Sequence, residues 1–418
     1  MKENNTIVFL CHFSNSLIRN KLILKDYHIT NGILRLLNKK AVRYIDFAIW
    51  VSDYISEFEK HTDYSFYIVS PHKGMVKEYQ QFDINGINYI FFKCDRDYLS
   101  NLYRSRYRVE EKNDYARNRG VIHSIIKTIS PKLIILCGAE NPSYSSSVLD
   151  IKDIPIYVIP QTLLNDKKRI DMGVGSPYRR KIELEIFRHA NYYCTSDEKT
   201  VNRIREENEK AAFLPAGFPT HRPVVTIPEV KDYDFVFFAR KISKNKGIED
   251  LLHAFARVKS THNESSLNII GSCISEYKTV LCQLVTELGI NNNVYFSGYF
   301  DQITETYECV VKARVVVVPG ITAELNSTVR EAMFLGLPTI CYETPATNEI
   351  NKKKVCLLTA SMNDVEKLAQ QMQYAIEHPL KAREIAQNGK DYAESYFSNK
   401  TIVNRLLNNC QQIINKQV

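Results

Sequence analysis

The sequence predicts an α/β protein with two doubly wound parallel sheets, each in a domain of its own. Short apolar runs alternate with longer amphipathic ones along the whole chain, as in "PKLIILCG" and "ARVVVVPG". Strands that are apolar throughout are buried on both faces, which is typical of a parallel sheet covered by helices. At 418 residues the chain also exceeds what one hydrophobic core usually serves, so we expect two domains.

The expected strands are shared between the two halves of the chain. The first half contains "NTIVFLCHF", "YSFYIVSP", "INYIFFK", "PKLIILCG", "IPIYVIP" and "NYYCTS". The second half contains "DYDFVFFA", "SLNIIGS", "NVYFSG", "ARVVVVPG", "LPTICYE" and "KVCLLT". The segment "GIEDLLHAFARVKS" predicts a helix between two of them, because its apolar residues recur at helical spacing and form one stripe that would face a sheet. These residues are Ile248, Leu251, Leu252, Phe255 and Val258.

The series of runs is interrupted once, by the proline-rich stretch 214–234, which carries no helical period and indicates a connection between domains. We therefore place an N-terminal domain at 1–217, a linker at 218–231 and a C-terminal domain at 232–395. Residues 396–418 read as a last amphipathic helix, which could cross back to the N-terminal domain. Ligand sites are expected at the carboxyl ends of the strands, in a cleft between the two domains.

Composition excludes several classes of protein. A hydrophobic content of 44% and a charged content of 24% are typical of a globular chain and exclude disorder. No stretch approaches the ~20 apolar residues of a membrane span, and the start lacks a secretory leader, so a cytoplasmic protein is expected. Ten scattered cysteines without a Cys-x-x-Cys pair predict reduced core thiols. The net charge of +8 fits an acidic substrate, an anionic membrane surface or nucleic acid, but no basic block interleaved with aromatic residues favours nucleic acid.

Two cations follow the first predicted strand of the second half, in "FFARKISKNKGIEDLL". Arg240 and Lys246 would lie in the loop before a helix, next to Gly247, where a helix N-terminus already favours anions. Such a pair could clamp a diphosphate and stabilise its charge as a leaving group without a metal. On local grounds alone, a solvated basic loop explains the same residues.

The segment "PGITAELNSTVREAMFLGLPTICYE", residues 319–343, places two carboxylates on either side of a polar turn. Glu324 precedes a predicted helix N-terminus, and Glu331 lies within the helix, where it could accept hydrogen bonds from a ribose diol. Thr328 and Glu331 also have the spacing of a capping box, with Thr328 at the N-cap and Glu331 at the third helical position. Both interpretations of Glu331 stay open at this point.

Four segments in this order resemble the donor-binding domain of the family 4 retaining glycosyltransferases, which have the GT-B fold. They are "FARKISKNKGIEDLLHAF", "LNIIGS", "VYFSGYF" and residues 319–343, and the resemblance covers roughly residues 232–400. It implies that Arg240 and Lys246 hold the diphosphate of a nucleotide sugar and that Glu331 binds its ribose. The other donor-side residues that we expect are Asn326, Ser327, Thr328 and Gly271.

One position departs from the family pattern. The E-x7-E motif would place its first acid eight residues before Glu331, where this chain has Ala323. In the family that first acid touches the donor sugar near its anomeric centre. We expect a turn that is one residue tighter, so that Glu324 takes this role; the alternative is a sugar that is held differently.

The N-terminal half resembles the family only loosely, since "CHFSNSLIRNKL" lacks the Gly-Gly that often follows the first strand. Polar residues after three predicted strands are nevertheless candidates for binding acceptor hydroxyls, although each could be an ordinary loop residue. The candidates are Ser14, Asn15, Arg19, Glu140, Asn141 and Gln161, the last at a position where many relatives carry a histidine.

Three further patterns are set aside. Asp232 and Asp234 spell a metal-binding D-x-D, but they precede their strand and would lie at the wrong end of the sheet. Gly173 and Gly175 form only a fragment of a dinucleotide fingerprint and follow no strand. Several histidines lack cysteine or acidic partners at ligand spacing and read as surface or packing residues; among them are His12, His72 and His123. We therefore expect no metal.

The resemblance implies a hexosyltransferase (EC 2.4) that moves a sugar from a nucleotide diphosphate to a glycan or lipid-linked oligosaccharide, with retention of configuration. Capsule or other bacterial surface polysaccharide is the expected product, and the inner face of the plasma membrane is the expected place of work. No cofactor and no nucleic-acid partner are expected. Two alternatives remain: a non-catalytic sugar-nucleotide-binding subunit, which would explain the displaced Glu324, and a sugar-nucleotide epimerase of similar architecture.

Overall fold

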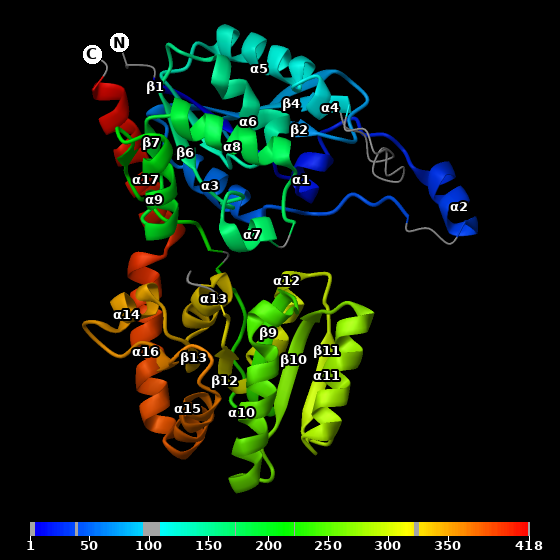
Figure 1. Ribbon diagram of the computed structural model, residues 1–418, viewed down its shortest axis with the longest axis vertical. Coiled ribbons are helices and arrows are strands. Elements are labelled where there is room, and N and C mark those ends of the chain that lie inside the picture. Colours follow the sequence, from blue (N-terminus) through cyan, green and yellow to red (C-terminus); the bar gives the residue numbers. More distant parts are fainter. Residues whose placement is uncertain are drawn as a thin grey trace. The chain divides into compact units, whose positions relative to one another are not determined.

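The computed structural model describes residues 5–37, 41–94, 109–171, 173–220, 222–321 and 326–416. The chain forms two compact units, each with one sheet (Figure 1). Unit 1 comprises Met1–Pro219 and Asn399–Val418, and unit 2 comprises Thr220–Ser398. Within the described ranges, none of the helices is both long and apolar enough to cross a membrane.

Unit 1 contains an eight-stranded sheet in the order β3-β4-β2-β1-β5-β6-β7-β8. All neighbouring strands are parallel except β3 and β4. The central strands are buried on both faces, as their apolar sequences predict. The strands are β1 (Asn5–Leu10), β2 (Tyr64–His72), β3 (Tyr79–Ile84), β4 (Ile87–Lys93), β5 (Leu133–Cys137), β6 (Ile156–Ile159), β7 (Tyr192–Tyr193) and β8 (Ala212–Phe213).

The antiparallel edge strand β3 was not predicted. It joins β4 through a two-residue turn in which Asn85 and Gly86 both have positive φ, 54° and 81°. An Asn-Gly pair is the sequence signal for this kind of hairpin, and its backbone twist matches that of the flanking strands. β3 lies at the edge of the sheet, and exposed and half-buried residues alternate along it. It therefore lacks the wholly apolar sequence by which the other strands were predicted.

The helices of unit 1 cover both faces of its sheet. On one face α3 and α17 share a core with β1, β2 and β5, and on the other α5 and α8 share a second core with the same sheet. The helices are α1 (Ser16–Arg19), α2 (His28–Leu36), α3 (Ile49–Phe58), α4 (Val109–Lys112), α5 (Ala116–Ile129), α6 (Pro142–Ser145), the 3-10 helix η2 (Ser146–Asp150), α7 (Lys167–Asp171), α8 (Pro177–His189), α9 (Glu198–Glu207) and α17 (Asn399–Asn415).

Unit 2 contains a six-stranded, entirely parallel sheet in the order β11-β10-β9-β12-β13-β14. Its strands are β9 (Tyr233–Lys241), β10 (Leu267–Ser272), β11 (Val294–Gly298), β12 (Ala313–Val318), β13 (Thr339–Tyr342) and β14 (Leu358–Ala360). Its helices are the 3-10 helix η3 (Lys244–Lys246), α10 (Ile248–Thr261), α11 (Ser275–Glu287), α12 (Ile303–Val310), α13 (Ser327–Leu335), α14 (Pro345–Asn351), α15 (Val365–Glu377) and α16 (Pro379–Tyr396).

Side chains of β9 alternate between two cores. Phe235 and Phe237 pack with α10, α11 and α15, whereas Val236 and Phe238 pack with α12 and α13 on the opposite face. The predicted stripe of α10 is confirmed, because all five of its apolar residues are buried. The predicted fold class, two doubly wound α/β domains with mostly parallel sheets, is therefore confirmed.

The ten cysteines are free thiols, and seven of them are buried. Burial raises the pKa of Cys11 and of Cys137 well above the ordinary value, because an apolar surrounding disfavours the thiolate. These thiols are therefore poor nucleophiles and metal ligands, which agrees with the core-filling role that was predicted from their positions.

Candidate functional site

The carboxyl end of β9 lies in the middle of the sheet of unit 2, between β10 and β12. In open parallel sheets, ligand sites form at this edge, beside central strands. Arg240 is the penultimate residue of β9, not a loop residue as predicted, and Lys246 ends the single turn of η3. Both predicted cations therefore lie at the edge where a ligand is expected.

The end of β10 holds the backbone of Arg240 in place. The Ser272 hydroxyl donates a hydrogen bond to the Arg240 carbonyl (2.7 Å), and the Ile242 N–H donates to the Ser272 carbonyl (2.8 Å). Gly271 makes this contact possible, because a Cβ at its φ of 146° would lie 2.1 Å from the Ala239 carbonyl oxygen. Gly271 was expected on the donor side, and the structure gives it a packing role at this edge.

The turns after β9 and β12 interlock. The Ile321 N–H donates a hydrogen bond to the Asn245 carbonyl (3.0 Å). Gly247 has a φ of 70°, and a Cβ there would lie 1.8 Å from the Pro319 carbonyl oxygen. Only glycine fits such a position, since it combines positive φ with a backbone contact. This interlock holds the backbone on both sides of Lys246 against residues 319–321.

Helix α13 begins at Ser327 with Asn326 as its N-cap, whose side chain accepts a hydrogen bond from the Thr328 N–H (3.1 Å). Of the two interpretations left open for Glu331, the capping box with Thr328 is therefore wrong. The short amide of Asn326 caps the first turn, so Thr328 is already the second helical residue and is buried, and Glu331 is the fifth. Ser327 is exposed at the first position, beside the N–H groups of the helix start.

Lys246 and Glu331 interact electrostatically. Burial lowers the pKa of Lys246, and the negative charge of Glu331 opposes this by raising it. The net effect is a lowered pKa, so Glu331 does not fully compensate the buried ammonium. A second anion near Lys246 would stabilise its charge, and a diphosphate supplies one.

The structure thus brings together Lys246 and Glu331, which lie 85 residues apart in the sequence, with Arg240 on the same edge. Glu324 lies outside the described residues.

The candidates after β1 form a connected group in unit 1. Arg19 donates to the Ser14 hydroxyl (3.0 Å) and pairs with Asp46 (2.6 Å). Asn15 is the N-cap of α1, where its side-chain oxygen accepts a hydrogen bond from the Ile18 N–H (2.8 Å). Its amide nitrogen donates to the Ser52 hydroxyl of α3 (2.9 Å). These residues lie together after β1, but their side chains bind mainly one another and the start of α1.

Glu140 and Gln161 meet over Gly138, at the ends of β5 and β6. A Cβ on Gly138, whose φ is 91°, would lie 2.9 Å from both carboxylate oxygens of Glu140 and 3.0 Å from the amide nitrogen of Gln161. Asn141 donates to one of these oxygens, Oε1 (3.2 Å). The other oxygen, Oε2, is buried and has no hydrogen-bond partner in the described part of the chain.

Burial raises the pKa of Glu140 to about 7, with a smaller rise from the nearby charge of Glu183. Its own backbone N–H, Arg179 and Arg169 act in the opposite direction. Near neutral pH this carboxyl group therefore exists in both forms, as a hydrogen-bond donor and as an acceptor.

Glu183 was not predicted, although it positions the loop that carries Gln161. This fully buried carboxylate of α8 accepts hydrogen bonds from the backbone N–H groups of Leu164 and Asn165 (2.9 Å each) and from the Asn165 amide (2.8 Å). In the sequence it is one of several charged residues in an amphipathic helix, and no local pattern marks it as the buried one.

Of the patterns that were set aside, His12 and His72 lie near the carboxyl ends of β1 and β2 and pack against aromatic rings. The Asp234 carboxylate accepts from the Ser266 N–H (3.1 Å), and Asp232 pairs with Lys312 (3.5 Å); both acids lie at the amino end of β9, as predicted. Gly173 and Gly175 lie between α7 and α8. The residues that the structure covers include no cluster of three or more His, Cys, Asp or Glu side chains that could hold a metal ion.

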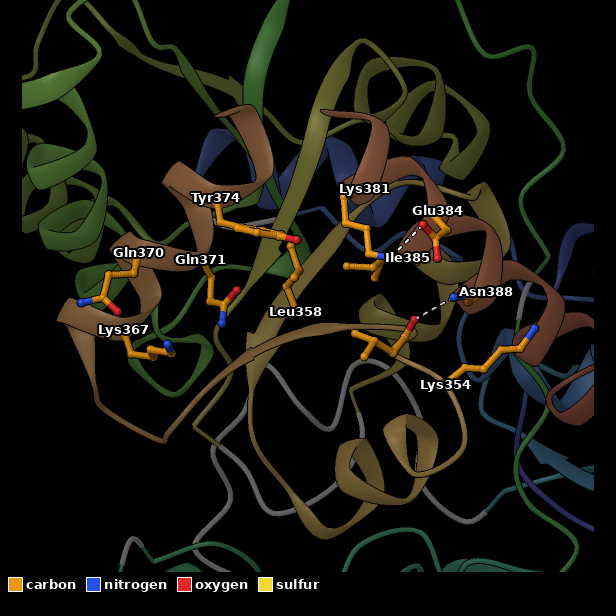
Figure 2. A pocket seen from close by; sticks show the side chains of 11 residues that line it. Lys354, Leu358, Lys367, Gln370, Gln371, Tyr374, Lys381, Glu384, Ile385 and Asn388 are labelled. Carbon is orange, nitrogen blue, oxygen red and sulfur yellow. Dashed lines mark hydrogen bonds and ion pairs between the residues drawn. The ribbon is translucent and has the colours of Figure 1, made fainter. Parts of the chain in front are cut away.

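A surface cavity of about 680 Å³ lies elsewhere in unit 2 (Figure 2). Its lining comes from α15 on one side, with Gln371 and Tyr374, and from α16 on the other, with Lys381 and Asn388. It reaches the sheet at Leu358, the first residue of β14, and so lies at an amino end. We do not assign the ligand site to this cavity, because the predicted donor residues lie at carboxyl ends.

Residues 224–392 match the protein family described as "Glycosyl transferases group 1". The matched segment lies within unit 2 and includes Arg240, Lys246 and Glu331. Part of the chain is also similar to an uncharacterized glycosyltransferase, MJ1607, of Methanocaldococcus jannaschii, with 29% identity over 126 residues. That match spans 30% of this chain and 31% of the relative.

Solved glycosyltransferases share the fold of the group 1 segment and of the rest of the chain. Sucrose-phosphate synthase from Thermosynechococcus elongatus aligns with a TM-score of 0.69 at 14% identity, over 99% of this chain and 100% of that one. A glycosyltransferase from Rickettsia africae gives 0.64 at 15%, over 99% of both chains. Anabaena HepE in complex with UDP and glucose gives 0.61 at 15%, over 97% of this chain and 99% of that one. These similarities confirm the GT-B fold class.

The interlock predicts a large loss of stability for Gly247→Ala. The left-handed backbone costs an alanine about 1 kcal/mol, and the contact with Pro319 must also be relieved, so we expect a total loss of about 3 kcal/mol or more. Gly289→Ala is the matched control, since its φ is 66° but a Cβ there meets nothing within 4 Å. Urea denaturation of both variants measures the difference. Equal losses would show that the turns are not held together as described.

The raised pKa of Glu140 predicts a stability that depends on pH. A carboxyl group whose folded-state pKa lies above its ordinary value stabilises the fold when protonated, and this contribution is lost as pH rises from about 4.5 through about 7. Glu140→Gln should therefore match the wild type near pH 5 and exceed it near pH 8, by up to roughly 3 kcal/mol at 1.36 kcal/mol per pKa unit. Urea denaturation at the two pH values checks this, and a difference that is independent of pH would contradict it.

Proposed function

We propose that the protein is a retaining glycosyltransferase that moves a sugar from a nucleotide-diphosphate donor to an acceptor hydroxyl. The observation that carries this proposal is the incompletely compensated, partly buried Lys246, which lies beside Glu331 within the segment that matches the group 1 family. The diphosphate of such a donor would add a second negative charge beside Lys246. The Anabaena neighbour, solved with UDP and glucose, supports a nucleotide sugar as the donor.

In the proposed reaction, the bond between the sugar and the diphosphate breaks while the acceptor oxygen approaches from the same face. Arg240 and Lys246 stabilise the negative charge that develops on the departing diphosphate, together with the N–H groups at the start of α13. The leaving phosphate accepts the proton of the acceptor hydroxyl, so the reaction requires neither a protein nucleophile nor a metal. The protein contributes position and charge.

Further donor contacts follow from the same geometry. Glu331 would accept hydrogen bonds from the ribose diol, and exposed Ser327 at the start of α13 would donate to a phosphate oxygen. Glu324 remains the proposed contact to the donor sugar near its anomeric centre.

Glu140 and Gln161 are the proposed acceptor contacts in unit 1. The Glu140 Oε2 atom would accept a hydrogen bond from an acceptor hydroxyl, while the Gln161 amide would donate to another. The acceptor that we propose is a glycan or a lipid-linked oligosaccharide, of the kind used for bacterial capsule or other surface polysaccharide. The enzyme would be a hexosyltransferase that works on the cytoplasmic side, at the inner face of the membrane.

Removal of either clamp cation should impair catalysis. Lys246→Ala or Arg240→Ala should lower kcat by roughly a hundredfold or more, because each removes a charge that acts mainly in the transition state. Lys244→Ala is the matched control, since its side chain is 81% exposed on the same turn. The measurement is the rate of sugar transfer from the nucleotide sugar that the binding screen described below identifies as the donor. Full activity of both cation variants would rule out the diphosphate clamp.

A panel of nucleotides and nucleotide sugars tests the function itself. The correct donor at a hundred times its dissociation constant should raise the free energy of unfolding by about 2.7 kcal/mol, measured as a thermal shift. The same donor is then supplied with crude glycan and lipid extracts. Transfer supports the proposal. Donor that binds and is never transferred indicates a binding subunit, and donor converted without any acceptor indicates an epimerase.

A further inference from the structure

Helix α2 carries an exposed apolar stripe. It stands clear of the sheet of unit 1 (Figure 1). Ile29, Ile33, Leu36 and the adjacent Leu37 are 80%, 54%, 87% and 60% exposed. Their spacing of 0, 4, 7 and 8 residues places them on one face of the helix. Singly exposed apolar residues are common on protein surfaces, but four on one short helix indicate a binding surface.

Side-chain hydrogen bonds attach α2 and its start to the segment that follows the helix, so the apolar stripe of α2 is not exposed through poor packing. The Asn31 side chain accepts from the Val42 N–H (2.7 Å) and donates to the Val42 carbonyl (2.9 Å). The Tyr44 hydroxyl donates to the Lys25 carbonyl (2.8 Å). Leu34 is the apolar residue of α2 that faces inward, with 6% of its surface exposed. The helix is thus anchored through its other faces.

The described chain around α2 is basic. Residues 19–37 and 41–43 contain five Lys and Arg and one acidic residue, Asp26, so their net charge is +4. Arg35 lies on α2 itself, and Lys21 and Arg43 are exposed on either side of it in sequence. An apolar helix face with basic residues around it is the pattern of a helix that lies in a membrane interface.

We propose that α2 binds the surface of an anionic lipid bilayer, with its apolar stripe among the acyl chains nearest the headgroups and its cations at the lipid phosphates. Charge complementarity favours this partner over a second copy of the chain. Two copies that met through α2 would bring two segments of net charge +4 together, whereas anionic headgroups neutralise that charge. The inference rests on the proposed function only for its biological setting.

Flotation of the full-length protein with vesicles tests the inference. Vesicles of phosphatidylcholine alone are compared with vesicles that also contain phosphatidylglycerol. The wild type should bind the anionic vesicles and bind the neutral ones at least tenfold less well. The double substitution Ile29→Ser with Leu36→Ser should weaken binding to anionic vesicles by roughly tenfold or more, because it removes two exposed apolar side chains.

Two matched controls separate α2 from general effects of surface change. Leu380→Ser removes an apolar residue of α16 that is 79% exposed, and vesicle binding should not change. Arg35→Gln with Arg43→Gln should weaken binding to anionic vesicles at low salt. Lys152→Gln with Lys400→Gln removes the same amount of charge from exposed positions elsewhere and should have a smaller effect.

Binding by the Ile29/Leu36 variant that equals that of the wild type would overturn the inference, as would failure of the wild type to bind anionic vesicles. A concentration-dependent dimer that this variant abolishes, without vesicle binding, would identify a second copy as the partner and would also overturn it. The thermal shift with the nucleotide donor separates the two proposals. A variant that loses vesicles but keeps the shift supports both, whereas a wild type with the shift and without vesicle binding refutes only this one.

Discussion

The candidate donor site depends on the close approach of two turns in unit 2. Gly247 touches the carbonyl of Pro319, and the Ile321 N–H closes the contact on Asn245. These turns follow adjacent strands of a parallel sheet, so the sheet brings them near each other, but the absence of a side chain at Gly247 lets them touch. The backbone on either side of Lys246 is thereby held before any ligand arrives, and such preorganisation is the main electrostatic contribution of proteins to catalysis.

Both candidate sites contain an ionisable group whose burial is incompletely compensated. Lys246 in unit 2 is a cation without a full counter-charge, and Glu140 in unit 1 is a carboxyl group with one unsatisfied oxygen. Such groups lower the stability of the free protein and gain stabilisation when a ligand of the right charge or hydrogen-bonding pattern binds. Proteins accept this instability at binding sites, where the ligand reverses it.

The sequence predicted the features that depend on regular periodicity or on local motifs. The apolar stripe of α10, the parallel sheets and the position of Lys246 before a helix all follow from residue spacing. The capping role of Thr328 did not hold, because Asn326 caps the helix two residues earlier, and asparagine is preferred to threonine at this position. The roles of Glu183 and Gly138 were not predictable, because each depends on tertiary packing. Glu183 contacts a loop that lies almost twenty residues before it, and Gly138 contacts the side chain of Gln161.

The return of α17 to unit 1 has a consequence for synthesis of the chain. Unit 2 is one continuous stretch, whereas the core of unit 1 includes Val403, Leu406 and Cys410 from beyond unit 2. During translation, all of unit 2 leaves the ribosome before these residues do. Nascent unit 1 therefore exposes the apolar surface of β5 and α3 that α17 later covers, and the second unit of the chain can complete its fold first.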